Sequence, residues 1–75
     1  MKNVYRRRTM CPPEFLGRRV QPTAEAFRKN IFKRRAVIVG ESLNKRNWWI
    51  IVDGNSYRID VAKSFVEDEK DEMPT

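Results

Sequence analysis

Three short runs of strand-forming residues lie within residues 36–61, and they limit the possible folds more than any other feature. Residues 36–39 and 48–52 are rich in β-branched and aromatic side chains, and residues 56–61 alternate between polar and apolar ones. Asp53 and Gly54 separate the last two runs. Because Asp-Gly is the typical pair of a two-residue hairpin turn, the sequence predicts an antiparallel meander of three strands.

This turn predicts a register, and the register predicts two faces of the sheet. Three cross-strand pairs would face the core: Val52 with Asn55, Ile50 with Tyr57, and Trp48 with Ile59. A five-residue loop at 43–47 would add Ile38 and Gly40 to this face. The opposite face would carry the remaining residues: Val37, Val39, Glu41, Trp49, Ile51, Ser56 and Arg58. It is so apolar that either the sheet curls to cover it, as in a small barrel, or it is a docking surface.

A short helix is predicted upstream, at residues 23–29. Thr23 is a suitable N-cap, Glu25 favours the positive end of the helix dipole, and basic residues follow in the last turn. Phe27 and Ile31 are spaced i and i+4, so we expect them to form the inward face of this helix.

Charge divides the 75-residue chain into three parts. The chain holds 16 Lys and Arg against 10 Asp and Glu, a net charge of +6, but residues 1–35 carry most of the basic side chains and residues 66–75 carry five acids. We expect a flexible basic arm at residues 1–15, a folded domain at 16–67 and a disordered acidic tail at 68–75. The tail either keeps the protein in solution or imitates nucleic acid and shields the basic surface.

Composition also excludes several classes of function. The chain has no histidine and a single cysteine, so zinc modules and Ser-His-Asp or Cys-His catalysis are ruled out. No segment approaches the length of a membrane span. We therefore expect a non-enzymatic, monomeric, cytoplasmic protein with no metal, cofactor or membrane contact.

Several short motifs between residues 17 and 67 suggest a family. They are Gly17-Arg18-Arg19-Val20, the Thr23 helix, Arg35-Ala36-Val37-Ile38-Val39-Gly40, the Asp53-Gly54 turn, and Tyr57 followed by Lys63-Ser64-Phe65-Val66-Glu67. In this pattern the chain resembles small phage and prophage proteins with an SH3-like, KOW-type barrel. It departs from the family at Ala36, where glycine is usual, at Val52, where tryptophan is usual, and in lacking a closing histidine.

The resemblance implies a strongly bent sheet of about five strands. A first strand would lie near residues 18–21 and a last one near 65–67, after a tight turn at 62–64. The expected core is a set of hydrophobic side chains with two phenylalanines at one end: Val20, Ile38, Ile50, Tyr57, Ile59, Phe65 and one tryptophan, with Phe27 and Phe32 as the caps.

The same resemblance implies a function, because such barrels dock on the transcription or translation machinery and small phage proteins often capture a host enzyme. We expect a non-catalytic regulator of bacterial RNA polymerase that inhibits initiation or acts in antitermination. The expected protein-binding residues are a basic anchor and one exposed aromatic: Met1, Lys2, Val4, Tyr5, Arg6, Arg7, Arg8 and Trp49. The expected nucleic-acid-binding residues are all basic: Arg18, Arg19, Lys33, Arg34, Arg35, Lys45, Arg46 and Arg58.

Three alternatives stay open. The chain could be a small RNA- or DNA-binding module that uses its basic surface directly. It could inhibit another host or defence protein, or it could be a structural piece of a virion or ribosome. Binding that disappears on nuclease treatment would favour the first of these over polymerase regulation.

Overall fold

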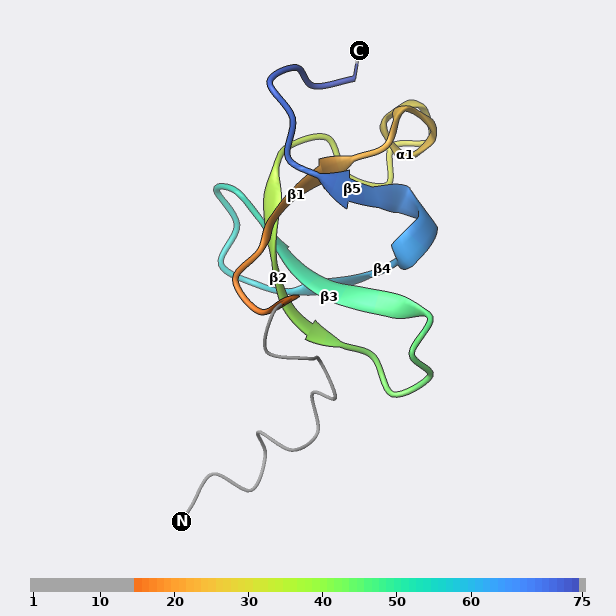
Figure 1. Cartoon of the computed structure of the whole chain (residues 1–75), viewed down its shortest axis with the longest axis vertical. Helices are drawn as coiled ribbons and strands as arrows, with labels where there is room; N and C mark the ends of the chain where they lie inside the picture. Colours follow the sequence, from red (N-terminus) through yellow and green to blue (C-terminus); the bar gives the residue numbers. More distant parts are fainter. Residues whose placement is uncertain (1–14, 75) are drawn as a thin grey trace.

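Five antiparallel strands form one sheet in the computed structural model, which describes residues 15–74 (Figure 1). The strands are β1 (Arg19–Pro22), β2 (Ala36–Glu41), β3 (Asn47–Val52), β4 (Ile59–Ala62) and β5 (Val66–Asp68), and one short helix, α1 (Ala24–Arg28), follows β1. The strand order across the sheet is β4-β3-β2-β1-β5. The prediction of a mainly β fold with about five strands and one helix is confirmed, and no helix within residues 15–74 is long and apolar enough to cross a membrane.

The predicted closed barrel is not seen. β4 and β5 are the two edges of the sheet, although only the 3₁₀ helix η3 (Lys63–Phe65) connects them along the chain. The backbone of β5 pairs with β1 instead, with Val20 opposite Asp68 and Pro22 opposite Val66. The sheet is strongly curved (Figure 1), but its edges stay apart.

The predicted register between β3 and β4 is wrong by two residues. Ile50 pairs with Ile59 and Trp48 with Val61, so pairing starts only at Ile59. A slip of two residues keeps every side chain on its predicted face, because the side-chain period of a strand is two. Tyr57 is left in the loop before β4 with 60% of its surface exposed, so its predicted place in the core is wrong.

Contacts at the Asp53-Gly54 turn account for this longer loop. The turn itself forms, since Asn55 N donates to Val52 O at 2.9 Å and Gly54 has a φ of 90°. However, Asp53 N donates to Arg35 O at 2.8 Å, which continues the pairing with the β2 side. A Cβ on Gly54 would lie 2.9 Å from Arg34 Nη1, so the arginine packs directly on the turn. These contacts hold the turn against the chain before β2, and β4 begins later.

A bulge in β2 changes the predicted faces of Gly40 and Glu41. Ile38 pairs with Ile50, but the register then shifts and Gly40 pairs with Trp49. Glu41 consequently lies opposite Trp48 and is only 8% exposed, whereas the sequence placed it on the outer face with Trp49. Gly40 moves to the face on which Glu41 was expected.

Helix α1 begins and ends at well-defined caps. Thr23 Oγ1 accepts a hydrogen bond from Ala26 N at 3.1 Å, which confirms the predicted N-cap. At the other end Asn30 adopts a φ of 61°, Ile31 N donates to Ala26 O and Asn30 N to Phe27 O, the pattern of a Schellman motif. The inward residue is Ala26, which is fully buried, while Phe27 is half-buried and Ile31 is exposed. The predicted inward pair is therefore wrong, because the helix ends before Ile31.

The core lies on the inner side of the curved sheet. Its buried side chains are Val20, Ala26, Phe32, Ala36, Ile38, Trp48, Ile50, Val52 and Val61. Partly buried residues pack around them: Phe15, Ile59, Phe65 and Val66. Trp48 belongs to the core and Trp49 does not. This confirms the prediction that Trp48 lies on the core face of β3.

Candidate binding surfaces

Gln21 fastens the acidic C-terminal segment to β1. Its side chain is completely buried. The amide nitrogen donates to Glu67 Oε2 at 2.9 Å and to the Glu72 carbonyl at 3.1 Å, and the amide oxygen accepts from Lys70 N at 2.9 Å. The disordered tail at residues 68–75 stays a prediction. In the structure Asp68 ends β5, Lys70 N and the Glu72 carbonyl bond to Gln21, and Glu69 N donates to Arg19 O.

Three of the predicted nucleic-acid-binding arginines lie against this segment. Arg18 forms an ion pair with Asp68 at 3.0 Å, and Arg35 lies 3.6 Å from Glu69 and donates to the carbonyl of Lys70. Arg19 lies 3.7 Å from Glu69. We call Arg18, Arg19 and Arg35 the paired arginines, because each already has a carboxylate partner.

Arg19 also donates two hydrogen bonds to the carboxylate of Asp53. Its two terminal nitrogens lie 2.8 and 2.7 Å from the two carboxylate oxygens. These hydrogen bonds raise the pKa of Arg19 and lower the pKa of Asp53, and the positive charges of Arg34 and Arg35 lower the pKa of Asp53 further. The geometry is bidentate, so it ties the β3–β4 turn to β1.

The other predicted basic residues do not form one continuous surface. Lys45 and Arg46 lie in the turn between β2 and β3, whereas Arg34 packs on Gly54 after the other end of β3. A strand of this length spans roughly 17 Å. Within residues 15–74 no carboxylate lies within ion-pair distance of the remaining members of the set, which are Lys33, Arg34, Lys45, Arg46 and Arg58.

The outer side of the sheet carries an apolar face with an arginine stacked on it. Trp49 and Ile51 alternate with the core residues of β3, and Val37 pairs with Ile51. All three are half-buried. The guanidinium carbon of Arg58 lies 4.3 Å from the ring centroid of Trp49, as the predicted proximity of these residues suggested. We call Val37, Trp49, Ile51 and Arg58 the Trp49 face.

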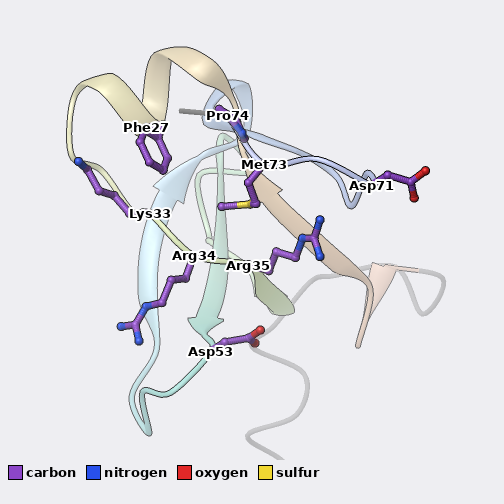
Figure 2. A pocket seen from close by; sticks show the side chains of 8 residues that line it. All are labelled: Phe27, Lys33, Arg34, Arg35, Asp53, Asp71, Met73 and Pro74. Carbon is purple, nitrogen blue, oxygen red and sulfur yellow. The ribbon is translucent and has the colours of Figure 1, made fainter.

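A groove of about 510 Å³ opens between α1, the chain before β2 and the C-terminal segment. Its lining combines apolar, basic and acidic side chains: Phe27, Lys33, Arg34, Arg35, Asp53, Asp71, Met73 and Pro74. Figure 2 shows Phe27 from α1 and Met73 from the C-terminal segment near its centre, with Arg34 and Asp53 toward one end. The ammonium of Lys33 lies 4.7 Å from the centroid of the Phe27 ring.

A third cluster lies where β2 meets η3. Lys63 Nζ bonds to the nearly buried carboxylate of Glu41 and lies 4.2 Å from the ring centroid of Trp48. The ammonium thus makes an ion pair with a carboxylate and a cation–π contact with an aromatic ring. This arrangement holds the bulged end of β2 against the core and leaves no charge free for a ligand.

Gln21, Phe27 and Met73 belong to these surfaces, although they are not among the predicted site residues. A glutamine in a strand and a methionine near an acidic run give no local sign of such contacts. The predicted arm residues lie outside the described part of the chain: Met1, Lys2, Val4, Tyr5, Arg6, Arg7 and Arg8. Within residues 15–74, no three Cys, Asp or Glu side chains gather in a group that could hold a metal ion.

Comparison with known proteins returns no match to a family model, a curated protein or a solved structure. The resemblance to phage proteins with an SH3-like barrel stays a prediction from the sequence.

Proposed function

We propose that this protein is a non-catalytic binding module whose Trp49 face docks on a partner protein, and that the partner is bacterial RNA polymerase. One observation carries the docking surface. Trp49 stays half-buried under Arg58 on the outer side of an open sheet, although its neighbour Trp48 fills the core. A large aromatic ring is held in place there without being enclosed.

The composition of the Trp49 face suits a protein interface. Tryptophan and arginine are the side chains most enriched among residues that dominate binding energy, and such residues are typically ringed by smaller apolar contacts. Val37 and Ile51 provide that apolar surround, and Trp49 and Arg58 provide the anchor. The stack with Arg58 also orients the ring before binding, which lowers the entropy lost in the complex.

The choice of polymerase rests on the resemblance of the sequence. The five short strands and the tight η3 segment before the last of them agree with the bent sheet that the resemblance implies, although the sheet is not closed. We therefore propose a phage-encoded regulator that inhibits initiation or acts in antitermination. The basic residues 1–10 would add a second anchor on the polymerase.

The test measures binding of the full chain to purified, nuclease-treated bacterial RNA polymerase at moderate salt. Trp49→Ala should weaken binding about 10-fold or more, as expected for a central aromatic anchor. Leu43→Ala is the matched control, because Leu43 is 78% exposed in the turn between β2 and β3 and lies outside the Trp49 face. Equal binding by Trp49→Ala and the wild type would overturn the docking face. No binding by the wild type would overturn the choice of polymerase.

Direct binding of RNA or DNA is the second candidate. The Trp49–Arg58 stack favours it, because aromatic rings beside arginine are also the platforms on which single-stranded bases stack. A complex that forms with nucleic acid in the absence of any protein, and that Trp49→Ala abolishes, would favour this candidate over polymerase docking.

A further inference from the structure

The groove beside α1 has the chemistry of a ligand site. We infer that it binds a nucleotide, with the base against Phe27 and Met73 and the phosphate at Lys33 and Arg34. This site is separate from the Trp49 face and does not depend on the proposed function.

The size and the walls of the groove fit one nucleotide. Its volume of about 510 Å³ falls within the usual range of small-ligand sites, roughly 300–1,000 Å³. Phe27, Met73 and Pro74 supply the apolar surface, and a planar base gains most from such a surface by stacking on the aromatic ring. Phe27 and Met73 line the same groove, and Figure 2 shows both side chains at it.

The charges around the groove favour an anion. Asp53 already receives both terminal nitrogens of Arg19, and Arg35 lies against Glu69 and the Lys70 carbonyl. Within the described residues, Lys33 and Arg34 lie within ion-pair distance of no carboxylate. Asp71 also lines the groove, and Figure 2 shows it on the opposite side from Lys33 and Arg34. Within residues 15–74, Lys33 and Arg34 are therefore the groove cations without a carboxylate partner, and a phosphate ester matches their charge.

Both cations line the same groove as Phe27 and Met73. The ammonium of Lys33 is held over the Phe27 ring, and the guanidinium of Arg34 is held against Gly54. Because both side chains have a fixed neighbour, little side-chain entropy is left to lose on binding. A neutral aromatic ligand would use the apolar wall and leave both charges unused.

The C-terminal wall of the groove is also held in place. Gln21 binds the backbone of Lys70 and Glu72, immediately before Met73 and Pro74. The nucleotide site therefore depends on the fastened acidic segment, although the carboxylates of that segment neutralise a different set of arginines. A free nucleotide and a nucleotide within a single strand share this chemistry, so the test uses both.

The test measures fluorescence anisotropy of a labelled single-stranded oligonucleotide of about eight nucleotides with the full chain. The variant Lys33→Gln/Arg34→Gln should weaken binding about 10-fold and reduce the slope of log affinity against log salt by about 0.7, the contribution of the one phosphate that the two cations neutralise on a single strand. Lys45→Gln/Arg46→Gln is the matched control, since it removes the same charge at the far end of β3. Equal losses of affinity in the two double variants would overturn the site.

Phe27→Leu tests the stacking wall separately. Leucine keeps an apolar side chain beside the core but provides no aromatic face, so binding should fall about 5-fold while the melting temperature stays close to wild type. Unchanged binding by a folded Phe27→Leu variant would contradict the placement of the base. Competition by a nucleoside monophosphate would identify the free nucleotide as a ligand, and competition by unlabelled strand alone would identify the polymer. If neither the nucleoside monophosphate nor the single strand binds the protein, the inference is overturned.

Discussion

The paired arginines and the cations near the aromatic rings have the same chemistry but different surroundings. Arg18, Arg19 and Arg35 lie against carboxylates of the C-terminal segment, and Arg19 also binds Asp53. Lys33 and Arg58 lie over the rings of Phe27 and Trp49 instead. A ring attracts a cation without cancelling its charge, whereas a carboxylate does cancel it. The net charge of +6 thus describes the composition, and local pairing decides which basic side chains a partner meets.

The largest effect is expected from a substitution that detaches the acidic segment from β1, because the paired arginines would then lose their carboxylate partners in that segment. Gln21→Met keeps the size of the buried side chain but removes its three hydrogen bonds. At about 0.5–1.5 kcal/mol for each bond, the free energy of unfolding should fall by about 2–4 kcal/mol. Chemical denaturation measures this loss, and hydrogen exchange should show faster exchange at the Lys70 amide.

Asn44→Ala is a suitable comparison for Gln21→Met. Asn44 also makes side-chain hydrogen bonds, to Ser42 and to Arg46 N, but within a surface turn. Its loss should cost less and should leave the Lys70 amide protected. If Gln21→Met were as stable as the wild type, the segment would not depend on Gln21 for its attachment.

Local patterns predicted most of the strands but not the contacts that set their register. The type and spacing of Val37, Ile38 and Ile50 predict β2 and β3. Thr23 predicts where the helix begins. These signals are local, because strand and helix periods act over a few residues. The bulge after Ile38 and the exposed position of Tyr57 depend on contacts between distant segments, which no local pattern carries.

The candidate sites show the same division. Trp49 and Arg58 could be predicted together, because alternation along β3 places Trp49 on the outer side. The acidic run at the C-terminus predicted solvated charge, yet its register with β1 brings Glu67 to the buried Gln21. A polar residue in a strand is usually exposed, so the sequence did not predict that Gln21 would be buried and would bind the C-terminal segment. Phe27 was expected in the core and lies at the groove because the helix ends soon after it, at Arg28.

A smaller change would sharpen the comparison without releasing the segment. Glu69→Gln removes the carboxylate that lies 3.7 Å from Arg19 and 3.6 Å from Arg35. Because all three side chains are partly exposed, the free energy of unfolding should fall by about 1 kcal/mol or less. The affinity for a single-stranded oligonucleotide should rise, because Arg35 loses its carboxylate partner, whereas Arg19 keeps Asp53.

Glu25→Gln is the matched control for Glu69→Gln. It changes the net charge by the same amount but breaks only an exposed pair with Lys29 on α1. An equal rise in oligonucleotide affinity for both variants would mean that net charge alone controls binding. Such a result would contradict the distinction between paired and available cations.

The bond between Arg19 and Asp53 predicts a dependence of stability on pH. The pKa of Asp53 in the folded protein is below its ordinary value of 3.8, chiefly because Arg19 donates hydrogen bonds to the carboxylate. A lowered folded-state pKa stabilises the protein above the unfolded pKa, and this contribution is lost as the pH falls through the folded value. The melting temperature should therefore drop below about pH 4.

Asp53→Asn isolates this contribution. The variant should melt below the wild type at neutral pH, and the difference between the two should shrink as the pH falls below about 4. Arg19→Gln should show the same convergence, because it removes the other half of the contact. A constant difference between Asp53→Asn and the wild type from about pH 7 to about pH 2 would show that the carboxylate charge contributes nothing to stability.

The smallest effect is expected at the edge of the sheet, where Arg18 meets Asp68. The side chains are 41% and 66% exposed, so water and salt screen the pair. Arg18→Ala should change the free energy of unfolding by about 0.2–1 kcal/mol, and the change should decrease further in high salt. Arg18 also lies 5.3 Å from the centroid of the Phe15 ring, so part of its contact is independent of Asp68.

A double-mutant cycle of Arg18→Ala with Asp68→Ala separates the two contacts. A coupling energy near zero would show that the ring, rather than the carboxylate, holds Arg18. Arg18 would then belong with Lys33 and Arg58 among the cations available to a partner. A measurable coupling that vanishes with added salt would keep it among the paired arginines, as the 3.0 Å contact with Asp68 leads us to expect.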